Sequence, residues 1–390
     1  MRVGLIGNMN NNHFVLARYL RDEGIDAHLV LASNEFSHFH PSADSFDSDY
    51  LDFTREVTWG SQIDLRTVDP NLIRQDLSEF DILIGCGFSP GFCQKSGRSL
   101  DVFVPYGSDL YEATRYSKMP HRFIRHFKSV SLQRKGIANS KVISMPLCSS
   151  LYESALDQFA SASQRWRNSI PLVYGPAYSK EKLDQNALSS QWKTHFDELR
   201  SESDFLVFMS GRHVWKCSTK NPNHKGNDLF IRGWSEFASR NPSAHIRLVM
   251  FEYGPDFRHT KDLAKQLNID HTISWIPVVP RKEIMMGLKC ADLACGDFTH
   301  SWIAGGVTFE ALSLGVPILK YRNAALHPEL QEDLYPIINA ATPSAIAGGL
   351  DWAFSCPGDL KKMGLQGRQW YDDAIVAPAL EQFTNYISQC

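Results

Sequence analysis

The chain has 390 residues, a length that favours two domains, each large enough to bury its own core. Its formal net charge of −3 and its pI of about 6.5 exclude a general nucleic-acid binder, which needs a clear excess of positive charge. No apolar run approaches the ~20 residues that span a bilayer, no signal peptide is evident, and the eight cysteines include no CxxC pair. We therefore expect a cytoplasmic protein with reduced thiols, either soluble or peripheral at the inner face of the membrane.

The first part of the chain predicts a doubly wound parallel sheet. Residues 2–6 form an apolar strand, residues 13–23 an amphipathic helix closed by Gly24, and residues 27–31 the next strand. Further strands are expected at 81–85 and 101–104, each followed by small or polar residues. Because ligands gather at the carboxyl ends of such strands, the turns supply these candidate binding residues: Asn11, Asn12, Tyr106 and Ser108.

Two titratable residues in these turns each allow two interpretations. Asp109 can orient or deprotonate a hydroxyl, or it can simply cap the helix that begins near Leu110. His13 stands at a helix start, where it either faces a ligand cleft or is a helix-end histidine in contact with solvent. The sequence leaves both pairs of alternatives open.

Residues 33–56 are predicted to form a loop. They include the triplet Asp47-Ser48-Asp49, a pattern that also occurs at Mn²⁺-diphosphate sites. Because no strand precedes the triplet, we interpret it as part of a loop and predict no metal site.

A basic stretch follows, with no acidic residue and eight Lys or Arg residues between Ala113 and Tyr152. Its segment 118–141 interleaves apolar and basic side chains, so it can lie on an anionic bilayer surface. The alternative is an ordinary surface helix whose apolar face joins the core.

The second half repeats the strand–helix alternation. A strand at 205–210 leads to Gly211 and Arg212, and Lys225 precedes a helix that runs to residue 238. The rest of this half predicts strands at 246–251, 272–276 and 293–295 and helices at 259–267 and 281–289. The insert between Arg212 and Lys225 is either a flap over a ligand or a surface loop.

The stretch from residue 291 to residue 321 organises this half. An apolar strand gives way to a polar loop, Gly305 and Gly306 open a helix over 307–314, and a strand at 316–321 follows. Such a helix start presents unpaired N–H groups and a positive dipole end to an anion. Glu310 lies about one turn further, so a diphosphate at the glycines would place its ribose within reach of this carboxylate.

The segment GGVTFEALSLGVPIL resembles the donor-site motif of GT-B glycosyltransferases, especially the family-4-like retaining group. The second Glu of their Glu-x7-Glu pattern matches Glu310, whereas Trp302 occupies the place of the first. The resemblance implies that Arg212 and Lys225 grip the diphosphate of a UDP- or GDP-sugar without an obligatory metal or other cofactor. It also implies a donor site completed by Gly211, Val279, Gly305, Gly306 and Val307.

The same resemblance implies two Rossmann-like domains facing a central cleft. Residues 1–185 would bind the acceptor, residues 186–370 the donor, and a terminal helix at 371–390 would cross back to the first domain. Residues 169–182 resemble the strand and Pro/Gly-rich turn that finish the first domain, and the polar residues 180–202 are expected to form the linker.

The expected activity is transfer of a sugar from a nucleoside diphosphate to a hydroxyl of a surface glycan, glycolipid or glycoprotein. A retaining reaction needs no enzyme base, whereas an inverting one would use His13 or Asp109. Two alternatives remain open: a non-catalytic nucleotide-sugar-binding subunit, favoured by Trp302, and a sugar-nucleotide epimerase on the same scaffold.

Overall fold

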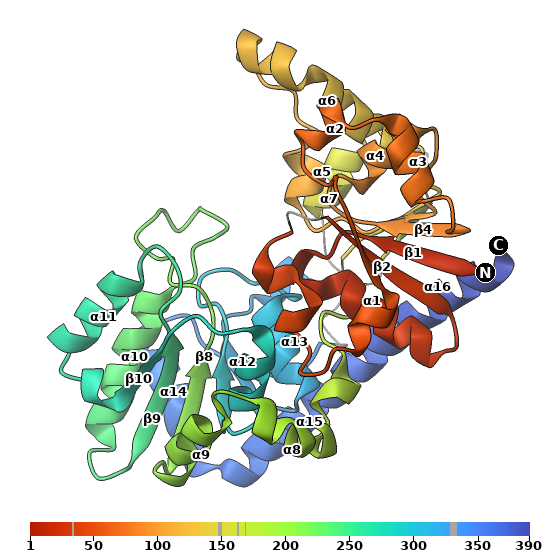
Figure 1. Cartoon of the computed structure of the whole chain (residues 1–390). Helices are drawn as coiled ribbons and strands as arrows, with labels where there is room; N and C mark the ends of the chain where they lie inside the picture. Colours follow the sequence, from red (N-terminus) through yellow and green to blue (C-terminus); the bar gives the residue numbers. More distant parts are fainter. Residues whose placement is uncertain (33–34, 147–149, 162–163, 168, 328–333) are drawn as a thin grey trace. The chain divides into compact units, whose positions relative to one another are not determined.

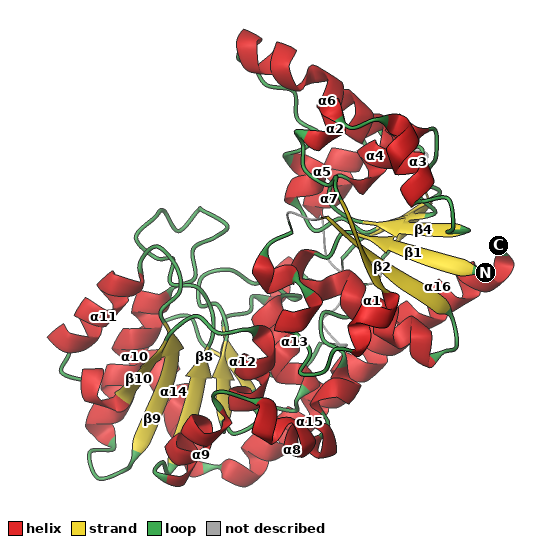
Figure 2. Ribbon diagram, in the orientation of Figure 1, coloured by secondary structure: helices red, strands yellow, loops and turns green. Residues whose placement is uncertain are grey.

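The chain folds into two α/β units, each built on a parallel sheet. The computed structural model describes the backbone of residues 1–390 except 33–34, 147–149, 162–163, 168 and 328–333, and it leaves out the side chains of 120–125, 150–151 and 180. Unit 1 comprises Met1–Tyr174 with Ile375–Cys390, and unit 2 comprises Gly175–Ala374. Figure 1 traces the elements in chain order, and Figure 2 shows that helices flank the sheet of each unit.

Unit 1 has a seven-stranded sheet in the order β3-β2-β1-β4-β5-β6-β7, with every pair parallel. The strands are β1 (Arg2–Ile6), β2 (Asp26–Ala32), β3 (Thr54–Val57), β4 (Ile82–Gly85), β5 (Val102–Phe103), β6 (Val142–Ser144) and β7 (Gln164–Trp166). The strand order reverses between β1 and β4, and this is where such sheets form a ligand crevice.

The helices of unit 1 cover the sheet and complete its core. They are α1 (Asn12–Asp22), α2 (Asp64–Thr67), α3 (Pro70–Asp76), α4 (Ser89–Ser96), α5 (Ser108–Tyr111), α6 (Pro120–Ala138), α7 (Ser150–Leu156) and α16 (Ala377–Gln389). Phe383 and Ile387 of α16 are buried in one apolar cluster with Val3 and Leu5 of β1. The terminal helix therefore packs on the first unit, as predicted, after a π-helical turn at Asp372–Val376.

Unit 2 has a six-stranded parallel sheet in the order β10-β9-β8-β11-β12-β13. Its strands are β8 (Phe205–Met209), β9 (Ile246–Phe251), β10 (Ile273–Ile276), β11 (Leu293–Cys295), β12 (Ile318–Lys320) and β13 (Ile338–Asn339). Its helices are α8 (Lys180–Asn186), α9 (Lys193–Ser201), α10 (Asn227–Arg240), α11 (Phe257–Gln266), α12 (Arg281–Leu288), α13 (Gly306–Ser313), α14 (Pro343–Ser355) and α15 (Pro357–Tyr371). The reversal of strand order lies between β8 and β11, so the turns after these two strands meet at one edge of the sheet.

Two sequence predictions need correction. Residues 169–174 contain no strand, and the sheet of unit 1 ends instead at β7. Pro171 lacks the N–H that a ladder requires, which disfavours a strand there. Within the segment expected to be a loop, Thr54–Val57 forms the edge strand β3, paired with β2. The Asp47 carboxylate bonds locally, accepting from Ser45 Oγ at 3.0 Å and from the Asp49 N–H at 3.2 Å.

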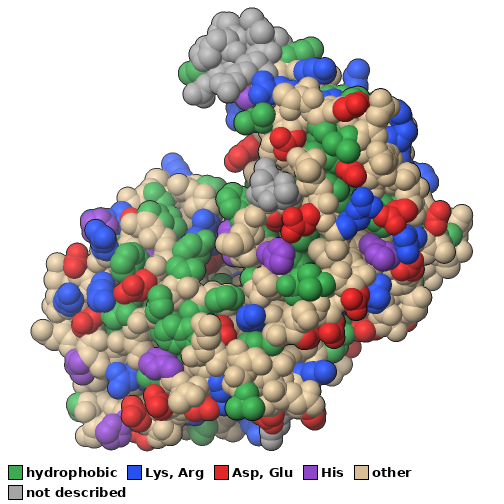
Figure 3. Space-filling model, viewed as in Figure 1, with side chains coloured by type: hydrophobic (Ala, Val, Ile, Leu, Met, Phe, Trp, Pro, Cys, Tyr) green, Lys and Arg blue, Asp and Glu red, His purple; other side chains and the backbone are tan. Residues whose placement is uncertain are grey.

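The basic stretch contains helix α6, whose second half packs on α4. A Cβ on Gly136 would lie 2.0 Å from the Pro90 carbonyl oxygen, so only glycine permits this approach. Val130 is buried, whereas Phe127 is exposed; the side chains of 120–125 lie outside the described residues. Across the described part of the chain, no helix has both the length and the apolar character needed to cross a membrane. In Figure 3, acidic and basic side chains are interspersed over the visible face of each unit.

Candidate functional site

The insert between Arg212 and Lys225 leaves the edge of the sheet in unit 2 and returns to the same place. The Lys225 N–H donates to the Val214 carbonyl at 2.7 Å. Asn227, in the first turn of α10, accepts from the Val214 N–H at 3.0 Å and donates to the Arg212 carbonyl at 3.3 Å. The two predicted phosphate ligands are thus brought together at the carboxyl end of β8, although twelve residues separate them.

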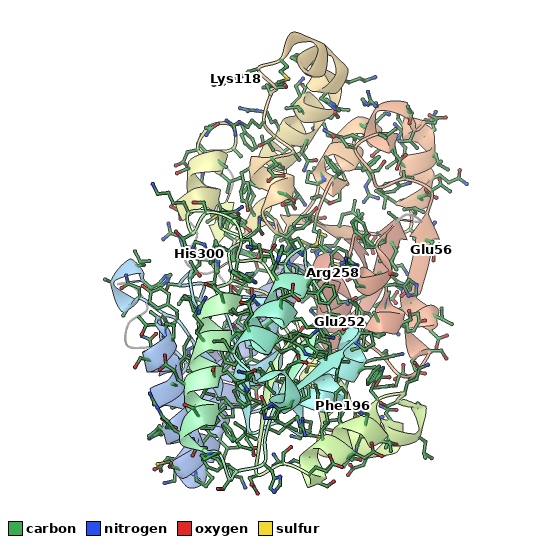
Figure 4. All side chains as sticks on the ribbon, turned by 90° about the vertical axis from the view of Figure 1, so that its left-hand side faces the viewer. Glu56, Lys118, Phe196, Glu252, Arg258 and His300 are labelled. Atoms are coloured by element: carbon green, nitrogen blue, oxygen red, sulfur yellow. The ribbon has the colours of Figure 1, made fainter. Side chains whose placement is uncertain are left out.

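The insert is fastened on two sides. The N–H groups of Trp215 and Lys216 donate to one Asp256 carboxylate oxygen at 2.8 and 2.9 Å, next to α11. On the other side, His300 Nε2 is 2.7 Å from the Asn221 carbonyl oxygen. Figure 4 shows His300 and Arg258 of α11 towards one end of unit 2 and Phe196 of α9 towards the other. The insert is therefore held beside the turn after β11.

Lys225 is paired with an acidic residue of the next turn. Its Nζ lies 2.8 Å from Asp297 Oδ2, and each side chain is about 20% exposed. Gly226 adopts a left-handed conformation, with φ +69°, and a Cβ there would lie 2.8 Å from Thr299 Oγ1. Glycine therefore allows the turns after β8 and β11 to touch, which sets the Lys225 ammonium beside Asp297. Arg212, in contrast, is exposed and donates to Asn223 Oδ1 at 3.3 Å.

Glu310 is also engaged in an ion pair. It lies in α13, and its Oε1 is 3.0 Å from Nε of Arg281, the first residue of α12. Both side chains are about nine-tenths buried, at 11% and 10% exposed. Gly305 is the N-cap of α13 and has no side chain to satisfy the free N–H groups, and a Cβ on Gly306 would lie 3.8 Å from Glu310 Oε1. The carboxylate therefore lies beside the open first turn of the helix.

The remaining donor candidates occupy the same edge of the sheet. Gly211 follows β8, and Val307 is in the first turn of α13. Val279 follows β10, but its side chain is buried, whereas the neighbouring Val278 is 64% exposed. Only the backbone of Val279 is therefore placed to contact a ligand.

In unit 1, the carboxylate of Asp109 accepts hydrogen bonds from its own turn and from the neighbouring one. It is 2% exposed and accepts from the N–H groups of Gly87, Tyr106 and Gly107 at 3.0, 3.1 and 3.0 Å. Burial raises the pKa of the Asp109 carboxyl to about 7, against the opposing effect of these hydrogen bonds. The carboxylate ties together the turns after β4 and β5.

The other candidates of unit 1 divide into buried and open residues. His13 is fully buried rather than in contact with solvent, and its Nδ1 lies 2.9 Å from the Gly7 carbonyl oxygen. Asn11 and Asn12 are also buried; the first donates to the His38 carbonyl, and the second accepts from the His13 N–H. Ser108 is exposed.

A small cavity at the carboxyl ends of β1 and β4 contains one of the predicted residues. It has a volume of about 100 Å³, and Tyr106 forms part of its wall. Reasoning from sequence did not single out Glu35, which also lines this cavity and whose pKa burial raises to about 7. A carboxyl whose pKa lies near physiological pH can accept or release a proton.

Two buried histidines predict how stability depends on pH. Burial lowers the pKa values of His13 in unit 1 and His213 in unit 2 to about 4, below the ordinary value near 6.5. As pH falls below 6.5 the unfolded chain takes up these protons first, so stability present above 6.5 is lost towards pH 4. Burial raises the pKa values of Glu35 and Asp109 to about 7, and protonation of these carboxyls in the folded state opposes this loss. The histidine contribution is therefore measured as a difference: the urea midpoint of wild type, relative to that of His213→Gln, should decrease as the pH is lowered from 7 to 5.5. A difference that is the same at both pH values would contradict the assignment.

Comparison with known proteins identifies the fold. No family model matches the chain, and no curated protein sequence matches it. Anabaena HepE in complex with UDP shares 12% identity, with 100% of each chain covered and a TM-score of 0.61. A glycosyltransferase from Rickettsia africae shares 12%, with 99% of this chain and 97% of that chain covered and a TM-score of 0.59. UDP-GlcNAc 2-epimerase from Methanocaldococcus jannaschii shares 15%, with both chains fully covered and a TM-score of 0.59. This likeness over whole chains shows that the protein has the GT-B fold.

Proposed function

We propose that this protein is a glycosyltransferase that moves a sugar from a nucleoside-diphosphate sugar to a hydroxyl of a surface glycan, glycolipid or glycoprotein. The observation that supports the proposal is that Arg212, Lys225 and the open start of α13 all belong to turns at the carboxyl edge of the sheet of unit 2, where the Lys225 ammonium lies 2.8 Å from Asp297. Two cations and a row of free N–H groups match the charge of a diphosphate. The structures of HepE with UDP and with UDP-glucose support a donor of the UDP class.

The proposed reaction retains the configuration of the sugar. Arg212, Lys225 and the helix start would stabilise the charge that develops on the departing diphosphate. The phosphate oxygen that leaves the sugar would take the proton of the acceptor hydroxyl. Glu310, beside the first turn of α13, would accept hydrogen bonds from the ribose hydroxyls. The buried and internally bonded positions of His13 and Asp109 favour a reaction that needs no enzyme base. The protein would act in the cytoplasm at the inner face of the membrane, with segment 118–141 contacting the lipid.

A sugar-nucleotide epimerase is the second candidate, because the M. jannaschii epimerase has the same fold over its whole length. Such an enzyme needs acid and base groups around the sugar. Glu35, which lines the cavity at the carboxyl ends of β1 and β4 and whose pKa burial raises to about 7, is a carboxyl of unit 1 that suits proton transfer. Incubation with UDP-GlcNAc separates the two: epimerisation without an acceptor supports this candidate, whereas slow release of free sugar and UDP supports a transferase.

A thermal-shift screen over UDP, GDP, ADP and inorganic pyrophosphate tests the proposal first. A ligand at a hundred times its dissociation constant stabilises the folded state by roughly 2.7 kcal/mol, and we therefore expect a clear rise in Tm with UDP or GDP. Arg212→Ala should reduce this rise because it removes a phosphate ligand, whereas Arg232→Ala, on the outer part of α10, serves as the matched control. Absence of a shift with every nucleotide would refute the proposed donor site.

A further inference from the structure

A buried lysine lies behind the helix start that the proposed function assigns to the diphosphate. Lys320 is the last residue of β12 and is 1% exposed. Its stem passes close to the turn after β11, because a Cβ on Gly296 would lie 3.0 Å from Lys320 Cβ. A burial this complete is unusual for a lysine, which keeps its ammonium in water unless the group has a specific task.

The ammonium of Lys320 holds the loop between β11 and α13. Its Nζ donates to the Trp302 carbonyl at 2.6 Å, to Thr308 Oγ1 at 3.2 Å and to the Tyr335 hydroxyl at 3.3 Å. Tyr335 in turn donates to the Ile303 carbonyl at 2.8 Å. These contacts lie on both sides of Gly305 and Gly306, so the lysine fixes the segment that begins α13.

The three partners of this ammonium are uncharged, so its positive charge is not cancelled by contact. Burial is the largest cause that lowers the pKa of Lys320, which is about 8. Asp297, whose carboxylate is bonded to Lys225, raises this pKa from a distance, whereas Arg322 and Lys225 lower it further. Thr308 lies in the first turn of α13, where the helix dipole is also positive. The neighbourhood therefore has an excess of positive charge that an anion would relieve.

We propose that Lys320 is a positioning residue of the donor site, which holds the 302–308 loop in shape and adds a positive charge behind the place where the diphosphate binds. This inference rests on the proposed function. It has a consequence that a purely structural lysine would lack: a bound dianion favours the protonated form of Lys320. At a pH just above 8, where much of Lys320 is neutral, binding should therefore draw a proton from solution.

The test is calorimetric titration of UDP into the whole protein at pH 8.5, in two buffers with different ionisation enthalpies. We expect uptake of roughly half a proton or more for each UDP bound. The phosphates of UDP are fully ionised at this pH, and burial raises the pKa of Tyr335, so neither group supplies this signal. Lys320→Met should abolish the uptake and weaken UDP binding at pH 7 about tenfold or more. Lys265→Met, at an exposed position of α11, should change neither quantity.

Lys320→Arg keeps a permanent charge, so it should retain more affinity than Lys320→Met and show no proton uptake. If wild-type protein binds UDP at pH 7 and takes up no proton at pH 8.5 or at any higher pH up to 9.5, the role of Lys320 is overturned while the donor site stands. Since that measurement uses unaltered protein, it decides the matter even if Lys320→Met does not fold. If wild-type protein binds neither UDP, GDP nor pyrophosphate at pH 7, both the donor site and the role of Lys320 fail.

Discussion

Replacement of Lys225 by alanine is expected to lower kcat for sugar transfer by about 10²–10³-fold, the usual effect of removing one group that stabilises a transition-state oxyanion. The loss has two physical parts. The diphosphate loses its ammonium partner. In addition, the carboxylate of Asp297, which in the wild type lies 2.8 Å from the Lys225 ammonium, is left unneutralised by that ammonium and repels the phosphate charge. The measurement is UDP release at saturating donor, with the UDP-sugar that gives the largest thermal shift.

Asp297→Asn supplies the opposite control. It frees Lys225 from its ion pair, so UDP should bind more tightly than to wild-type protein. The double variant Lys225→Ala, Asp297→Asn should bind UDP better than Lys225→Ala alone, because the repulsive carboxylate is gone. A Lys225→Ala variant with normal turnover would place the leaving diphosphate elsewhere.

Replacement of Glu310 by glutamine is expected to weaken UDP binding by about 10- to 100-fold, because a neutral amide accepts hydrogen bonds from ribose hydroxyls less strongly than a carboxylate does. The loss should be specific to the ribose. Inorganic pyrophosphate should bind the variant and the wild type alike, and 2′,3′-dideoxy-UDP should also fail to distinguish them. Isothermal titration with the three ligands measures this difference.

The same substitution has a structural cost that must be separated from the binding effect. Arg281 is about nine-tenths buried, and loss of the Glu310 carboxylate removes an ion pair that stabilises its charge, at a cost of up to about 3 kcal/mol. The double variant Arg281→Met, Glu310→Gln should recover Tm but not ribose discrimination. If UDP affinity returns together with Tm, Glu310 is a structural residue and the ribose assignment is wrong.

The sequence predicted those elements of the fold that have strong local signals. The strands at Arg2–Ile6, Ile246–Phe251 and Leu293–Cys295 are predominantly apolar, a polar or glycine residue follows each of them, and the structure has them at those limits. The edge strand Thr54–Val57 escaped prediction because three of its four residues are polar, and only pairing with β2 makes it a strand. Pairing of this kind is a tertiary contact that local patterns do not contain.

The predictions for the candidate site succeeded and failed for similar reasons. Motif and residue type singled out Lys225 and Glu310, whereas their partners Asp297 and Arg281 were not predicted, because each ion pair joins separate elements. Lys320 was hidden for a different reason. At the end of an apolar run a lysine normally reaches solvent, and only the packing of the 302–308 loop over β12 buries it.

The hydrogen bond between the Lys225 N–H and the Val214 carbonyl closes the loop that separates Arg212 from Lys225. The two residues therefore lie closer in space than their separation along the chain suggests. Residues 215–224 form a loop that begins and ends at this hydrogen bond. Its exposed tip, residues 218–220, lies between the anchors at Asp256 and His300 and apart from Asn223, the partner of Arg212, so the length of the tip can change while both cations keep their places. Doubling the length of a loop costs only about 0.6 kcal/mol in closure entropy. This tip, rather than the whole loop, is therefore the point at which a reporter peptide or a fluorophore can be inserted.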